Sequence, residues 1–254
     1  MNPQVKFQIA SKDKIAEFIF DLRNSLDVEN LSQRNNASCI RTILPRELVE
    51  EIMATDHLDN QLKSKIMEHI SLPPNKEKSI QDFITKIQKY WGNEINDIFF
   101  SEMKNIFTGE FIQKEYICYI TDEVVGAYFG ENEVTLDWQQ DIGLDKACFI
   151  LAEEISHLIY WQVWKKLFNK DISDIDEIFS IKGKEWSCWN IAEIMPEYIL
   201  VKNPTFGKFR WNKRKRYLGY PWIKKLEEEL NPIWKDKKDI PDFIKEVHKK
   251  LGVS

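Results

Sequence analysis

The chain has 254 residues, of which 43% are hydrophobic, 30% charged and 13% aromatic, a composition that indicates a folded globular protein and excludes a disordered one. Its formal net charge of -5 argues against a protein that binds nucleic acid over its whole surface. The N-terminus does not resemble a signal peptide and no apolar run approaches about 18 residues, so we expect a cytoplasmic protein without a membrane partner. The four cysteines are widely spaced without a CxxC pair, which favours reduced core thiols over disulfides.

The first hundred residues are predicted to be helical. Gly92 is expected to kink or end the last helix of this part, and a proline-containing break at 71–75 is the clearest internal boundary. Apolar residues recur at helical spacing over 11–26, 45–54, 60–70 and 79–107.

The pattern changes to β-type at Tyr116. Two or three antiparallel strands are predicted, since short runs rich in aromatic and β-branched residues alternate with turn residues. These runs are 116–120, 124–129 and 133–138.

The strands are followed by the longest strongly helical stretch, 145–168. Its apolar residues cover most of the circumference, so this helix should be buried nearly all round. Glu153, Glu154 and His157 lie within that apolar surface. Because ionisable groups in an apolar environment are costly unless they are paired or bind a metal, this helix is the candidate site.

The spacing of these residues predicts a metal centre. Glu153 and His157 are one helical turn apart and can reach one metal ion. Glu154 points to one side of that pair, where a general base for a metal-bound water would lie. A second buried helix is predicted over 186–201, and Pro196 within it should interrupt its regular hydrogen bonding. Glu193 on this helix is the candidate third ligand.

Strands, a helix with an HExxH-like motif and a second helix with a glutamate resemble the gluzincin branch of zinc metallopeptidases, over residues 116–201. The resemblance implies that Glu154 is the general base and that His157 and Glu193 are metal ligands. It also implies that Glu197 is the acidic residue that supports the family's first histidine, although Glu153 at that position has no imidazole N–H for Glu197 to accept.

The resemblance also implies that residues 134–138 form the edge strand along which an extended substrate lies. The chain departs from the family at Glu153, where the motif has its first histidine. Two glutamates and a neutral histidine bring about -2 charges to the metal, so a bound water would be acidified less. The departure favours either an oxygen-preferring metal such as manganese or iron, or the loss of metal and of ordinary peptidase activity.

The expected fold is therefore α+β and mainly helical: a zincin-like core with a small antiparallel sheet packed on an active-site helix. Residues 1–110 would form a helical lid or subdomain, and 111–254 the core with its C-terminal helices. The expected function is that of a metallopeptidase-related hydrolase with an altered site, acting on a peptide or protein. Its cofactor is zinc, another divalent metal, or none.

The alternative is a catalytically silent module, a pseudoenzyme that contacts a protein or a nucleic acid. A basic and aromatic stretch would make this contact, although such charge runs are more often solvated loops. Tyr217 or Tyr220 from the same stretch could instead donate a hydrogen bond to the transition state. The basic residues are Lys208, Arg210, Lys213, Arg214, Lys215 and Arg216.

Three further histidines lack ligand-spaced partners and are predicted to be surface residues: His57, His69 and His248.

Overall fold

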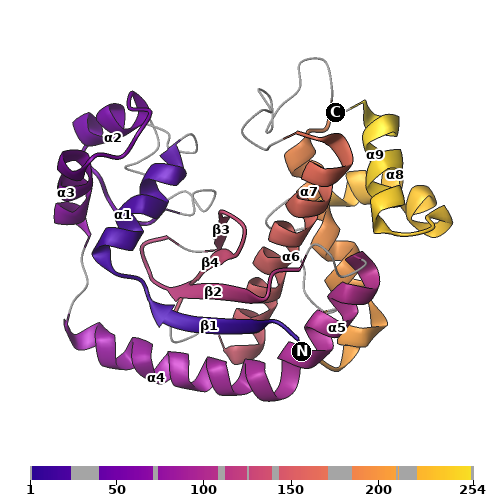
Figure 1. Ribbon diagram of the computed structural model, residues 1–254, viewed down its shortest axis with the longest axis horizontal. Coiled ribbons are helices and arrows are strands. Elements are labelled where there is room, and N and C mark those ends of the chain that lie inside the picture. The colour runs from indigo at the N-terminus through magenta and orange to yellow at the C-terminus, as the bar shows by residue number, and fades with distance from the viewer. Residues whose placement is uncertain are drawn as a thin grey trace. The chain divides into compact units, whose positions relative to one another are not determined.

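The computed structural model describes residues 2–23, 40–70, 74–107, 112–124, 126–138, 143–170, 185–209, 211 and 222–252 (Figure 1). The chain divides into two compact units. The sheet unit consists of Gln4–Asn93 and Glu115–Glu154, and the helical unit consists of Met1–Pro3, Glu94–Lys114 and Ile155–Ser254. The division near residue 110 that the sequence suggests stays a prediction.

The sheet unit contains a four-stranded mixed sheet with the order β1-β2-β4-β3. β1 pairs with β2 in parallel, β2 pairs with β4 in parallel, and β3 pairs with β4 antiparallel. The prediction of an antiparallel sheet is therefore wrong for the pairing of β2 with β4. The reason is that the chain leaves β2, forms β3 at the edge, and only then inserts β4 between them. The prediction that the first hundred residues are helical is wrong for residues 4–9, which form β1. The strands are β1 (Gln4–Ile9), β2 (Glu115–Ile120), β3 (Ala127–Phe129) and β4 (Glu133–Leu136).

The edges of this sheet are β1 and β3, not the strand at 134–138. β4 has a hydrogen-bonded neighbour on both sides, so it cannot accept an extended peptide as a further strand. The prediction that residues 134–138 lie along a substrate as an edge strand is therefore wrong. A peptide that extended this sheet would have to pair with β1 or β3.

Two helices of the sheet unit, α1 and α3, begin after residues whose side chains cap them. Ser11 Oγ accepts a hydrogen bond from the Lys14 backbone N–H at 3.1 Å, and Asp59 Oδ1 accepts one from Leu62 at 2.7 Å. The predicted helices at 45–54 and 60–70 are confirmed to within one residue at each end. The one at 11–26 begins as predicted, and its predicted end lies outside the described residues. The last begins at Pro74, inside the predicted break at 71–75 and five residues before the predicted start at 79. These helices are α1 (Lys12–Asp21), α2 (Arg46–Met53), α3 (Asn60–His69) and α4 (Pro74–Tyr90).

One hydrophobic cluster forms the core between the first three helices and the sheet. Phe18 of α1 is fully buried at its centre, stacked on Phe129 with ring centroids 4.1 Å apart and edge-on to Tyr119 at 5.2 Å. Since aromatic side chains bury the largest apolar areas, this trio fixes α1 against β2 and β3.

The kink expected at Gly92 takes the form of a π-helical turn, η2 (Trp91–Ile95), which separates α4 from α5 (Asn96–Phe107). The stretch Glu94–Lys114, which contains α5, belongs to the helical unit.

The helical unit is assembled from helices around an aromatic core. Its last helix is capped by Asp239 and ends at Gly252, whose φ of 63° is the left-handed conformation that glycine favours. The penultimate helix continues through Pro232 to Asp236. The elements are α5, α6 (Leu144–Phe168, shared with the sheet unit), α7 (Cys188–Pro196), η4 (Glu197–Val201), η5 (Pro204–Phe209), α8 (Ile223–Asp236) and α9 (Ile240–Leu251).

The architecture is thus α+β and mainly helical, as predicted. Within the described part of the chain, no helix combines the length and the apolar character needed to cross a membrane.

Candidate functional site

The glutamate and histidine motif lies in the middle of α6, the longest helix described. Asp145 in the first turn and Lys165 and Lys166 in the last turn complement the helix dipole. His157 is 2% exposed and Glu154 is 8% exposed, whereas Glu153 is half-buried. The prediction of a helix buried nearly all round, with ionisable residues inside it, is confirmed.

The structure brings His157 and Glu193 together within the helical unit. His157 Nε2 lies 3.6 Å from Glu193 Oε1, and the two residues come from different helices, α6 and α7. Glu193 is 8% exposed, so this contact is shielded from solvent. An interaction between two charged or polar groups is much stronger in such an environment than in water.

The helix that carries Glu193 starts at a well-formed cap. Ser187 Oγ accepts a hydrogen bond from the Asn190 backbone N–H at 3.2 Å, and the Ser187 backbone N–H donates to Asn190 Oδ1 at 2.9 Å. This reciprocal pair is a capping box, in which each residue's side chain accepts a hydrogen bond from the other residue's backbone N–H. The capping box fixes the residue at which α7 begins and thereby the position of Glu193 in the second turn of the helix.

Glu197 opens a π-helical segment directly after Pro196. Proline lacks a backbone N–H and cannot make the helical hydrogen bond at its own position, so the helix widens there. The Lys202 backbone N–H donates to the Glu197 carbonyl at 2.9 Å, the five-residue spacing of a π-helix. Glu197 is 5% exposed. π-helical turns are frequent at functional sites, and this one lies one turn beyond Glu193.

Glu154 belongs to the sheet unit, where its carboxylate lies over Gly126 just before β3. A Cβ atom placed on Gly126 would be 3.7 Å from Glu154 Oε1. Gly126 also has a φ of 60°, which residues with side chains rarely adopt. A side chain would make only an ordinary contact there, so the backbone conformation, and not the closeness of the carboxylate, favours glycine at this position.

A third ligand is not in place beside the histidine and glutamate pair. Among the residues that the structure describes, no three His, Cys, Asp or Glu side chains gather in a group that could hold a metal ion. The division between the units falls after Glu154, so Glu153 groups with the sheet unit and His157 with the helical unit.

Most of the basic stretch lies outside the described residues. Lys208 is the exception: it lies in the last turn of η5, with its ammonium group 4.8 Å from the centre of the Phe209 ring. Outside the description are Arg210, Lys213, Arg214, Lys215, Arg216, Tyr217 and Tyr220.

His248 is not the surface residue that was predicted. It is 1% exposed, and its Nε2 lies 3.2 Å from the Tyr160 hydroxyl. It follows Ile244 by one turn on the apolar face of α9, and this spacing is the signal that could have placed it in the core. His57 and His69 are exposed, as expected.

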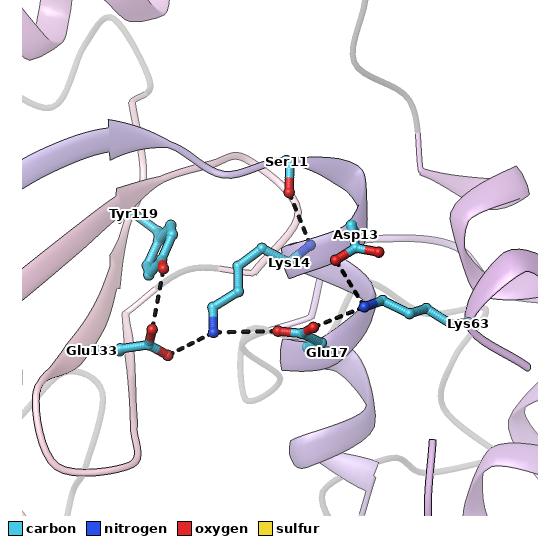
Figure 2. Close-up of polar contacts among 7 residues, drawn as sticks. All are labelled: Ser11, Asp13, Lys14, Glu17, Lys63, Tyr119 and Glu133. Atoms are coloured by element: carbon cyan, nitrogen blue, oxygen red, sulfur yellow. Dashed lines mark hydrogen bonds and ion pairs between the residues drawn. The ribbon is translucent and has the colours of Figure 1, made fainter. Parts of the chain in front are cut away.

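Sequence reasoning missed a polar cluster in the sheet unit that joins residues of four elements (Figure 2). The Lys14 ammonium group lies 2.8 Å from Glu133 Oε2 and 3.3 Å from Glu17 Oε2. Glu17 Oε1 lies 2.8 Å from Lys63 Nζ, and the Tyr119 hydroxyl donates to Glu133 Oε1 at 3.1 Å. No motif could reveal this cluster because its members come from α1, α3, β2 and β4.

The charges of this cluster stabilise one another. Burial alone would lower the pKa of Lys14, but the hydrogen bond and charge of Glu133 outweigh it and the pKa is raised. The hydrogen bond from Lys63 lowers the pKa of Glu17, and burial raises the pKa of Tyr119. A lysine held in its charged form is a poor nucleophile or base, so this cluster is assigned to stability and not to catalysis.

No family model, no curated protein and no solved structure matches this chain. Its function has to be inferred from its own residues.

Proposed function

We propose that this is a metallopeptidase-related protein with an altered metal site, in which His157 and Glu193 bind a divalent cation. The observation that supports this is the separation of 3.6 Å between His157 Nε2 and Glu193 Oε1. Two ligands about 2.1 Å from a tetrahedral zinc ion lie about 3.4 Å from each other. A direct N–H···O hydrogen bond would be shorter, at about 2.7–3.2 Å.

The remaining residues of the motif have proposed roles on the same helix. Glu153, one turn before His157, supplies a further carboxylate, and Glu154 takes up the proton of the attacking water. A bound cation would lower the pKa of that water and polarise the carbonyl group of a peptide. Because Glu153 replaces a neutral histidine with a carboxylate, the site should prefer manganese or iron more than the zinc peptidases do.

The test is the metal content of the full chain, purified without a nickel column, incubated with Zn²⁺ or Mn²⁺, and desalted. We expect about one ion per chain and a higher unfolding temperature with metal. His157→Asn and Glu193→Gln should lose the ion. Glu154→Gln should keep it and lose any peptidase activity, because the proposed base is removed while the ligands remain.

Matched controls are His69→Asn and Glu68→Gln, both at exposed positions of α3, which should bind metal as the natural chain does. If only a Glu153→His variant takes up zinc, the protein is the silent module, and binding partners should be sought with Lys208→Gln as a probe. Absence of metal from both the natural chain and Glu153→His would refute the metal site.

A further inference from the structure

A cavity of about 370 Å³ lies within the sheet unit, between α4 and the start of α6. This volume is at the lower end of the range of small-molecule sites. A Cβ atom placed on Gly143 would meet no other atom within 4 Å, as expected for a residue that faces open space. The described residues that line it are Ser79, Asp82, Phe83, Lys86, Trp138, Gly143 and Leu144.

One wall of the cavity is a single face of α4. Four of the lining residues recur at spacings of three, one and three along α4, which places them on the same side of the helix. They are Ser79, Asp82, Phe83 and Lys86. This face therefore presents a hydroxyl, a carboxylate, an aromatic ring and an ammonium group together.

The opposite wall is the junction between β4 and α6. Trp138 comes two residues after the carboxyl end of β4, and Leu144 is the first residue of α6. Ligands in sheets with parallel strands bind beyond the carboxyl ends of those strands, and the N-terminus of a helix attracts negative charge. The Tyr90 hydroxyl donates to Asp145 Oδ1 at 2.6 Å and ties the end of α4 to the start of α6.

The two charged residues of the lining are available to a ligand. Asp82 and Lys86 are both exposed, and neither forms an ion pair with any other residue in the described part of the chain. Since they are one turn apart and of opposite sign, they complement a ligand that carries both charges.

We propose that this cavity binds a small zwitterionic aromatic molecule, of the class of free aromatic amino acids. Phe83 and Trp138 contact the ring, Lys86 and the first turn of α6 bind the carboxylate, and Asp82 binds the ammonium group. This binding site is independent of the proposed metal site.

The experiment is a titration of the full chain with L-phenylalanine, followed by ligand-observed NMR or calorimetry. L-phenylalanine should bind, and L-leucine should bind more weakly because it lacks the ring. Phenylacetate carries only the carboxylate and 2-phenylethylamine only the ammonium group, so each reports on one charge of the site.

Lys86→Gln should weaken phenylacetate about fivefold and leave 2-phenylethylamine unchanged, and Asp82→Asn should do the reverse. Lys89→Gln, an exposed lysine of the same helix outside the lining, should change neither ligand. Circular dichroism checks that the variants fold. Absence of L-phenylalanine binding at millimolar concentration, or equal effects of Lys86→Gln and Lys89→Gln, would overturn the proposal.

Discussion

Replacing Ser187 by alanine should destabilise the helix that carries Glu193. Ser187 is 1% exposed, and its Oγ accepts a hydrogen bond from the Asn190 backbone N–H. Alanine cannot accept that bond, so the partly buried Asn190 N–H loses its acceptor, which is costly. Loss of such a cap costs about 1–2 kcal/mol of unfolding free energy. In a chain of this size, each kcal/mol lowers the unfolding temperature by about 2–4 °C.

Urea unfolding followed by circular dichroism measures this change as a shift of the midpoint at constant slope. Ser64→Ala is the matched control, since Ser64 is exposed within α3 and bonds only back to the Asn60 carbonyl. Alanine is the better helix former there, so the control should be neutral or slightly stabilising. If Ser187→Ala lost no more stability than Ser64→Ala, the cap would not be holding α7.

Three further predictions concern the sheet unit and the thiols. In a Cys39→Ser variant, a thiol reagent at pH 8 should label no cysteine of the native protein and three after unfolding in urea. Burial raises the pKa of the three remaining thiols, those of Cys118, Cys148 and Cys188, and the pKa of Cys148 rises to about 12. Rapid labelling of the native variant would contradict this. Glu17→Gln should destabilise the protein at pH 7 but not at low pH. The Lys63 hydrogen bond lowers the pKa of Glu17 below its ordinary 4.5, so this stabilisation is present above pH 4.5 and is lost as pH falls through the folded-state pKa; equal losses in urea unfolding at pH 7 and at low pH would contradict it. Phe18→Ala should cost about 3–5 kcal/mol in the same urea assay, because it empties the fully buried centre of the core; a loss below about 1 kcal/mol would show that the core closes around the gap.

Local patterns predicted the helices because their signals are local. The buried faces of α1 to α3, the interruption at Gly92 and the irregularity at Pro196 all depend on residues within a few positions of one another. The π-helical form of the last two could not be predicted, since the sequence marks where a helix is interrupted but not how its hydrogen bonds rearrange.

The sheet was harder because strand pairing is not local. Val5, Phe7 and Ile9 alternate with polar residues, and this period of two is the signal that could have revealed β1 in a part of the chain that was predicted to be helical. Its partner, however, begins at Glu115, and nothing in either strand specifies a parallel alignment. The direction of β4 was missed for the same reason.

In the candidate site too, the local features could be predicted from the sequence and the contact between helices could not. The positions of Glu153, Glu154 and His157 on one helix follow from spacing alone, and so does the burial of that helix. The 3.6 Å approach of Glu193 to His157 does not follow from it, because it depends on how α6 and α7 pack. Sequence reasoning could name the partner but could not supply the distance that supports the proposal.

The burial of these residues bears on the choice between the proposed metal site and a silent scaffold. Glu154, Glu193 and Glu197 are each at most 8% exposed, and His157 is 2% exposed. Burying a charged group costs free energy, and replacing buried ionic residues by apolar ones of similar size is often neutral or stabilising. A module that used only its outer surface would therefore gain from apolar residues at these four positions. The contact between His157 and Glu193 offsets part of that cost, and the proposed cation would offset a further part.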